Sequence, residues 1–238
     1  MKRPILSGFT RNESRTGAAC AIAGPSLLFI GTLLHPMQAD PNDAVAAFTE
    51  YAADHLWIAS HLTQLAGVAL IVVALLLLAD ELELSAGRGW AVVASGGALT
   101  TLALAIALQA VDGIALKRMV DAWAAAPAAQ KDAAFHVAFA VRQIEIGLAS
   151  TFCITLGITA TLYGGALLRV DKMYVKGLGA LALLGGVPTS VAGVVIAYSG
   201  FSALAMTINM PANFILLVWM LALGVSMWRS RTAPERGC

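Results

Sequence analysis

Residues 54–79, DHLWIASHLTQLAGVALIVVALLLLA, decide the class of this protein. Every residue after Gln64 in this stretch is apolar or glycine, and a helix needs about 20 such residues to cross the hydrocarbon core of a bilayer. The stretch nevertheless begins with polar groups, because His55, His61 and Gln64 stand at its start. Ionisable groups are costly inside a membrane and are by default candidates for a functional site.

The composition of the whole chain also points to a membrane. Of the 238 residues, 59% are hydrophobic and 12% are charged, whereas about 25% of the residues in average soluble domains are charged. The mean hydropathy is +0.79. The formal net charge of +1 and the lack of a long basic run argue against a nucleic-acid partner, since phosphate binding needs clustered lysines and arginines.

Six segments are apolar and long enough to cross a bilayer. We therefore predict an all-α integral membrane protein in which residues 1–238 form a single six-span domain, with the lipid bilayer as its first partner and an oligomer as an open alternative. The predicted spans are residues 17–35, 57–79, 90–111, 135–163, 174–198 and 209–228.

The distribution of basic residues predicts the orientation of these spans. With a cytoplasmic N-terminus, eleven of the 15 lysines and arginines lie on the cytoplasmic side: Lys2, Arg3, Arg11, Arg15, Arg88, Arg169, Lys172, Lys176, Arg229, Arg231 and Arg236. Cytoplasmic loops of membrane proteins carry such an excess of positive charge. We therefore predict a multi-pass protein of the bacterial inner membrane with both termini in the cytoplasm.

Two segments between the spans have the pattern of short amphipathic helices that lie at the membrane surface on the outer side. In PNDAVAAFTEYAADH, residues 41–55, either Asn42 or Asp43 can cap a helix. In GIALKRMVDAWAAAP, residues 113–127, Leu116, Val120 and Trp123 fall on one helical face. Both helices are expected to cover a polar pocket formed by the second, third and fourth spans.

In the predicted orientation, all four histidines of the chain lie on the outer side, together with an aspartate at the end of the third span: His35, His55, His61, His136 and Asp112. A bilayer that gathers these groups at one rim allows them to act on a common ligand. We therefore predict an outward-facing pocket that binds a small hydrophobic or metal-containing ligand.

Helical spacing divides the fourth span into two polar faces. His136 and Gln143 lie on one face, whereas Arg142 and Glu145 lie on another and are spaced to form an ion pair. On the second span, His61 and Gln64 share a face because they are three residues apart.

The ligand suggested first by these residues is haem b or a transition metal ion. Two neutral imidazoles on different helices can ligate haem iron, and His61 with His136 is the pair that the sequence favours. Residues that would orient a histidine ring or meet a haem propionate are Gln64, Gln143, Arg142 and Lys117. A smaller copper or zinc site would use His35, His55 and His61.

Two other functions remain open at this stage. In an intramembrane enzyme acting on a lipid or isoprenoid-like substrate, Glu145 and Asp112 would be the catalytic acid and base. A small-molecule carrier or a subunit of a membrane complex is the third alternative, since six spans can form two inverted halves.

Three stretches give the chain a resemblance to a family. They are GTLLHPMQADPNDAVAAF (31–48), LYGGALLRVDKMYVKGLGALALLGG (162–186) and FILLVWMLALGVSMWR (214–229). In topology and span-end features they resemble uncharacterised bacterial multi-pass membrane proteins that are grouped as a domain of unknown function. The resemblance implies a six-span inner-membrane protein and assigns no catalytic residues.

Overall fold

The computed structural model describes residues 11–229, and this part of the chain is helical with no β-strand. Six of its helices are long and apolar enough to cross a membrane, as predicted. The elements in chain order are α1 (Arg11–Leu33), α2 (Ala44–Ala53), α3 (Trp57–Glu81), α4 (Arg88–Gln109), the π-helix η1 (Ala110–Leu116), α5 (Lys117–Ala125), the short 3₁₀ helix η2 (Ala128–Gln130), α6 (Lys131–Leu167), α7 (Met173–Ser199) and α8 (Ala203–Arg229).

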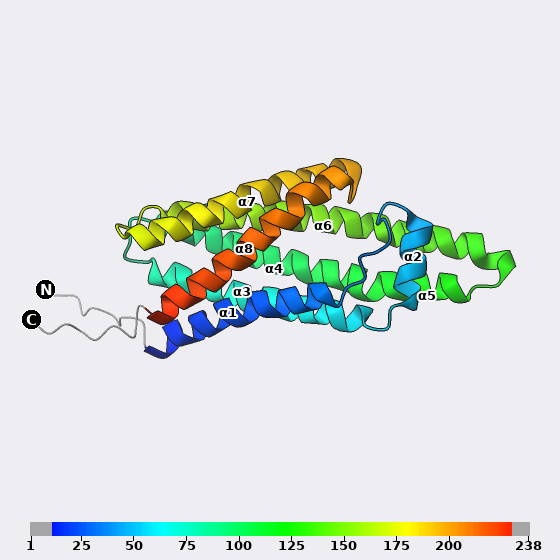
Figure 1. The fold of residues 1–238 in the computed structure, drawn as a ribbon, viewed down its shortest axis with the longest axis horizontal. Coiled ribbons are helices and arrows are strands. Elements are labelled where there is room, and N and C mark those ends of the chain that lie inside the picture. The colour runs from blue at the N-terminus through cyan, green and yellow to red at the C-terminus, as the bar shows by residue number, and fades with distance from the viewer. Residues whose placement is uncertain (1–10, 230–238) are drawn as a thin grey trace, which may run out of the picture.

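The six long helices form a closed ring. Each of α1, α3, α4, α6, α7 and α8 packs against the next, and α8 returns to α1. The start of α1 and the end of α8 lie at one end of the bundle, whereas α2 and α5 lie at the opposite end (Figure 1). We call the end with α2 and α5 the site end, since the polar groups described below lie there.

Small residues allow the helices of this ring to approach closely. A Cβ atom on Gly67 of α3 would lie 2.6 Å from the backbone nitrogen of Leu28 and 2.7 Å from the carbonyl oxygen of Gly24, both in α1. A Cβ atom on Gly157 of α6 would lie 2.4 Å from the carbonyl oxygen of Gly186 in α7. Close backbone contact at small residues is the usual way in which membrane helices associate, because burial of apolar surface adds little between lipid-exposed helices.

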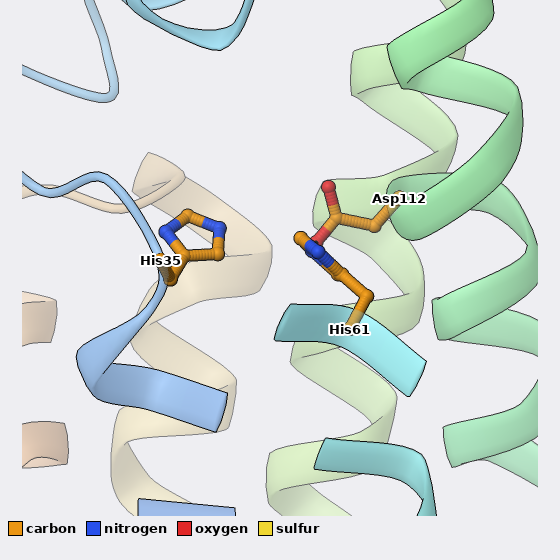
Figure 2. Close-up of side chains that lie close together, drawn as sticks. All are labelled: His35, His61 and Asp112. Atoms are coloured by element: carbon orange, nitrogen blue, oxygen red, sulfur yellow. The ribbon is translucent and has the colours of Figure 1, made fainter. Parts of the chain in front are cut away.

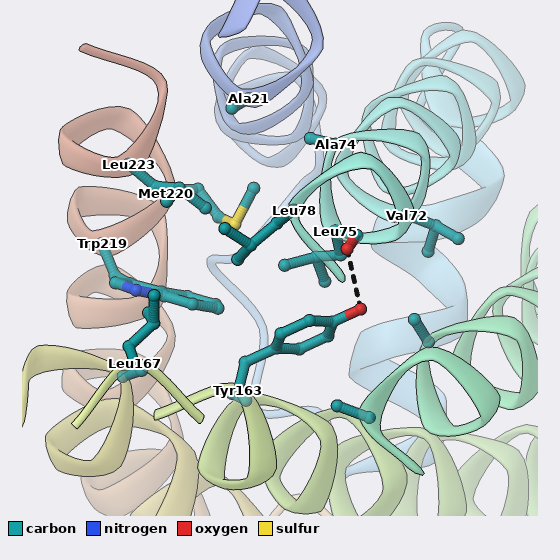
Figure 3. Close-up of a cluster of buried hydrophobic side chains, with 14 of the residues drawn as sticks. Ala21, Val72, Ala74, Leu75, Leu78, Tyr163, Leu167, Trp219, Met220 and Leu223 are labelled. Atoms are coloured by element: carbon teal, nitrogen blue, oxygen red, sulfur yellow. Dashed lines mark hydrogen bonds between the residues drawn. The ribbon is translucent and has the colours of Figure 1, made fainter. Parts of the chain in front are cut away.

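Larger side chains fill the centre of the bundle away from the site end. Figure 3 shows Trp219 and Leu223 of α8 and Tyr163 of α6 facing leucines of α3. The hydroxyl of Tyr163 donates a hydrogen bond of 2.8 Å to the carbonyl oxygen of Leu75. This contact satisfies the Tyr163 hydroxyl where water is scarce, and it fixes α6 against α3.

The two short helices expected on the outer side have different forms. The helix α2 is separate, and the carboxylate of Asp43 caps it by accepting hydrogen bonds of 3.1 Å from the backbone amides of Val45 and Ala46. The second segment does not stand apart from the third span, because α4 continues through η1 into α5 and forms one helical rod from Arg88 to Ala125.

The apolar face of this rod is covered by other helices of the protein. Leu116 and Val120 are fully buried in a cluster that also contains Phe48 of α2 and Ala138 of α6. Protein contacts therefore replace the lipid contacts that a surface helix would make.

Two helical rods are longer than a membrane span. The rod from Arg88 to Ala125 has 38 residues and α6 with η2 has 40, whereas about 20 residues cross the hydrocarbon core. Both helices therefore extend beyond the core at the site end.

Candidate metal centre

Three side chains from three separate segments meet at the site end of the bundle. His35 follows the end of α1, His61 lies near the start of α3, and Asp112 lies in η1. One ligand atom from each residue can be chosen so that all three atoms lie within 4.8 Å of one another. Figure 2 shows His35 opposite the contact between His61 and Asp112. We call these three residues the metal triad.

The hydrogen bonds of His61 determine which of its nitrogens carries a proton. Its Nδ1 lies 2.7 Å from the carbonyl oxygen of Trp57, one turn earlier in α3. Because a carbonyl oxygen only accepts, Nδ1 is the donor, and Nε2 of the neutral ring carries a lone pair. That Nε2 lies 3.1 Å from Oδ2 of Asp112. Two acceptors at this distance repel each other unless a proton or a metal cation lies between them.

His35 has the same arrangement. Its Nδ1 lies 2.7 Å from the carbonyl oxygen of Pro36, so this nitrogen also donates and Nε2 is left with a lone pair. Burial lowers the pKa of His35, and a protonated His61 would lower it further, whereas the carboxylates of Asp112 and Asp54 and the hydrogen bond to Pro36 act in the opposite direction. The ring of His35 is therefore kept in the neutral form that ligates metal ions.

Asp112 is held at the site by its backbone as well as by its side chain. The indole nitrogen of Trp57 donates a hydrogen bond of 3.0 Å to the carbonyl oxygen of Asp112. The next residue, Gly113, allows η1 to approach α3, because a Cβ atom there would lie 2.7 Å from Cβ of His61. π-Helical segments within α-helices occur frequently at functional sites.

Unpartnered acceptors surround the metal triad. Within residues 11–229, five buried side-chain nitrogen or oxygen atoms have no hydrogen-bond partner. Three of the five are acceptor oxygens of the site end: Asp54 Oδ2, Gln109 Oε1 and Asp112 Oδ1. Since buried polar atoms are nearly always satisfied, we expect a donor such as water, or a cation, beside these oxygens.

The loop that carries His35 is fixed at several points. The two carboxylate oxygens of Glu50 accept hydrogen bonds of 3.0 and 2.9 Å from the backbone amides of Gln38 and Ala39. Farther along the loop, Arg142 of α6 donates to the carbonyl oxygen of Pro41 over 3.2 Å. These contacts hold the loop and His35 in place before a ligand binds. Ligand binding therefore does not have to order the loop.

The predicted ion pair on the fourth span is present and buried. The guanidinium of Arg142 donates to the carboxylate of Glu145, and their side chains are 6% and 3% exposed. Aromatic rings lie over Arg142, with ring centres 5.7 Å away for Tyr51 and 5.0 Å away for Phe201. Burial raises the pKa of Tyr51 to about 12, so its phenol stays neutral beside this pair.

A second polar pair lies one helical turn from the metal triad. The side-chain nitrogen of Gln109 donates to Oε1 of Gln64 over 3.4 Å, which links α4 to α3. Gln64 is three residues after His61, and Gln109 is three residues before Asp112. The two polar pairs therefore bridge the same two helices at successive turns.

The other candidate residues lie apart from this group. His55 and Gln143 are exposed, and the side chain of His136 is 70% exposed with its Nε2 3.6 Å from the carboxylate of Asp132. The structure therefore does not bring His136 to the buried His61. Lys117 donates to the carbonyl oxygen of Tyr51 over 2.9 Å and caps the C-terminus of α2.

The sequence groups Asp112 with the four histidines at the outer rim, but the predicted metal site used His35, His55 and His61 and did not include Asp112. One signal in the sequence points to Asp112. A carboxylate directly after the third span lies, in a six-span topology, on the same side as histidines that flank the first and second spans.

Comparison with known proteins adds no further constraint. No protein-family model, curated protein or solved structure matches this chain.

Proposed function

We propose that this protein binds a divalent transition metal ion through His35, His61 and Asp112. The observation that carries the proposal is the convergence of three ligand atoms: Nε2 of His61 lies 3.1 Å from Oδ2 of Asp112, and a ring nitrogen of His35 joins them so that all three lie within 4.8 Å of one another. Both Nδ1 atoms donate hydrogen bonds to backbone carbonyls, and metal-bound histidines in most proteins make such a bond through the ring nitrogen that does not bind the metal.

The donor set favours zinc or copper. Two imidazole nitrogens with one carboxylate oxygen suit these borderline metals better than magnesium or calcium, which prefer oxygen ligands. Zinc–nitrogen and zinc–oxygen bonds are about 2.1 Å long, and in tetrahedral geometry they place neighbouring ligand atoms about 3.4 Å apart. The contact of 3.1 Å between His61 and Asp112 is a little shorter than this spacing, and all three ligand atoms lie within 4.8 Å of one another, so shifts of these side chains would complete the site.

This geometry supports a single ion better than haem. Axial haem ligation requires two imidazoles that face each other across the haem ring. The side chain of His61 is buried, with 2% of its surface exposed, whereas the side chain of His136 in α6 is 70% exposed. It also supports metal binding better than the acid–base chemistry proposed for Glu145, because Arg142 already engages that carboxylate.

We propose further that the metal triad opens toward the outer face of a bacterial inner membrane, with both termini in the cytoplasm. The charge distribution supports this orientation, since seven of the eleven lysines and arginines within residues 11–229 belong to the helix ends and loops opposite the site. Fusions at the C-terminus test it. Green fluorescent protein should fluoresce there and alkaline phosphatase should be inactive, and the reverse result would place the site end in the cytoplasm.

The direct test of function is metal binding by the protein purified in detergent and stripped with a chelator. We expect one Zn²⁺ or Co²⁺ to bind per chain. His61→Ala and Asp112→Ala should each weaken binding by at least about a hundredfold, because loss of an outer-shell partner alone weakens metal sites by about 10–100-fold. His136→Ala and His55→Ala are matched controls that should bind normally. Equal binding by all four variants would refute the site.

A further inference from the structure

The amide pair next to the metal triad contains a buried acceptor that the proposed metal site does not use. Gln109 is 9% exposed, and its Oε1 has no hydrogen-bond partner within the described chain. We propose that the metal ion keeps a water molecule as its fourth ligand, and that Gln109 positions this water by accepting a hydrogen bond from it. The inference rests on the proposed metal site and deepens it.

The orientation of the Gln109 side chain supports this role. Its amide nitrogen is directed to Oε1 of Gln64 on the neighbouring helix over 3.4 Å. This contact uses the donor side of the Gln109 amide and leaves the acceptor side free. A buried amide oxygen without a donor is unfavourable, so a donor that arrives with the ligand accounts for a glutamine at this position.

Distances along the helices match a single water molecule. Gln64 lies three residues after His61 in α3, which corresponds to a rise of about 4.5 Å. Gln109 lies three residues before Asp112, where α4 passes into the π-helix η1. A water bound about 2.1 Å from the ion donates a hydrogen bond of about 2.8 Å, and together these reach about 5 Å. One water therefore spans the step from the metal triad to the amide pair.

The acceptor oxygens beside the metal triad favour water over an anion as the fourth ligand of the metal ion. The unpartnered atoms at this level, Gln109 Oε1 and Asp112 Oδ1, are both acceptors. A metal-bound water has two hydrogens to donate, whereas an anionic fourth ligand would face two repelling oxygens. Three protein ligands with a water in the fourth position form an exchangeable site, as in catalytic zinc centres, rather than a closed structural one.

The test uses full-length protein in detergent, loaded with Co²⁺ and titrated with sodium azide, which replaces water at cobalt and changes its visible absorption. In the wild type, azide should shift the cobalt bands saturably. In Gln109→Leu, azide should bind about fivefold more tightly, because the water has lost a hydrogen bond and azide no longer faces an acceptor. Co²⁺ affinity should change by less than about threefold, since no metal ligand is removed.

Two further variants separate positioning from packing. Gln109→Glu keeps an acceptor oxygen, so its azide affinity should stay at or below that of the wild type. Thr101→Val lies on the same buried face of α4, where the Thr101 hydroxyl bonds only within the protein, and it should leave azide affinity unchanged.

Each outcome has a distinct meaning. If Co²⁺ binds but azide leaves its spectrum unchanged, the coordination sphere is closed, and this inference fails while the metal site stands. If azide binds equally to wild type and Gln109→Leu, the exchangeable position exists but Gln109 does not position its water. If Co²⁺ does not bind at all, the proposed function fails and this inference falls with it.

Discussion

The middle of the bundle and its site end are held together by different means. In the middle, helices meet at small residues such as Gly67 and Gly157, and polar side chains bond to backbone carbonyls, as Tyr163 does. At the site end, polar groups from separate segments face one another, and Asp112 and Gln109 each have an acceptor oxygen without a partner among residues 11–229. The middle is therefore held by close packing of helices, whereas the site end is held by polar contacts between separate segments and keeps acceptors that a ligand can use.

The largest effect on stability should come from breaking the buried ion pair at the site end. Arg142→Ala leaves the carboxylate of Glu145 buried without its partner, which is expected to destabilise the protein by about 3–5 kcal/mol. Thermal or denaturant unfolding in detergent measures this loss.

A double variant shows whether the loss comes from the isolated charge. Arg142→Leu with Glu145→Leu removes both charges, so it should be clearly more stable than Arg142→Ala. Equal destabilisation by the double variant would mean that Arg142 acts mainly by holding the loop at Pro41.

A methyl group at the closest helix contact tests the middle of the bundle. Gly67→Ala places a Cβ atom against backbone atoms of α1 that cannot move independently, so the helices must separate, with an expected loss of about 1–3 kcal/mol. Gly147→Ala is the matched control, because no atom lies within 4 Å of the added Cβ. A similar loss of stability in both variants would contradict the role of close packing.

A methyl group on Gly113 tests the close helix contact at the site end. Its Cβ would lie 2.7 Å from Cβ of His61, an atom whose position is fixed by the backbone of α3. Gly113→Ala should therefore push η1 away from α3, separate the imidazole from Asp112 and weaken Zn²⁺ or Co²⁺ binding by about tenfold. The free energy of unfolding should fall by about 1–3 kcal/mol, as for other overpacked contacts. Unchanged metal affinity would show that His61 does not depend on this contact.

The smallest effect is expected from the histidines outside the metal triad. His136→Ala should change the free energy of unfolding by less than about 0.5 kcal/mol, because its side chain is 70% exposed and its pairing with Asp132 is solvated. Its metal affinity should equal that of the wild type. A loss of metal binding would bring the haem hypothesis with His61 and His136 back into consideration.

The helical phase of the fourth span explains why only part of the site could be predicted. The spacing of Arg142 and Glu145 predicts their ion pair, and the structure contains it. The same spacing places His136 and Gln143 on another face, but it does not indicate which face meets the rest of the protein. Packing of α6 against α4 and α7 buries the face of Glu145 and leaves the other exposed.

The sequence by itself determined the class of this protein. Hydrophobic length is a local property, so the six spans, the all-α fold and the collection of histidines at one end can be read from the order of residues. Their partners cannot be read in this way. Only the tertiary structure decided that His61 meets Asp112 and His35, because that meeting depends on a π-helical turn and on how closely α3 approaches its neighbours.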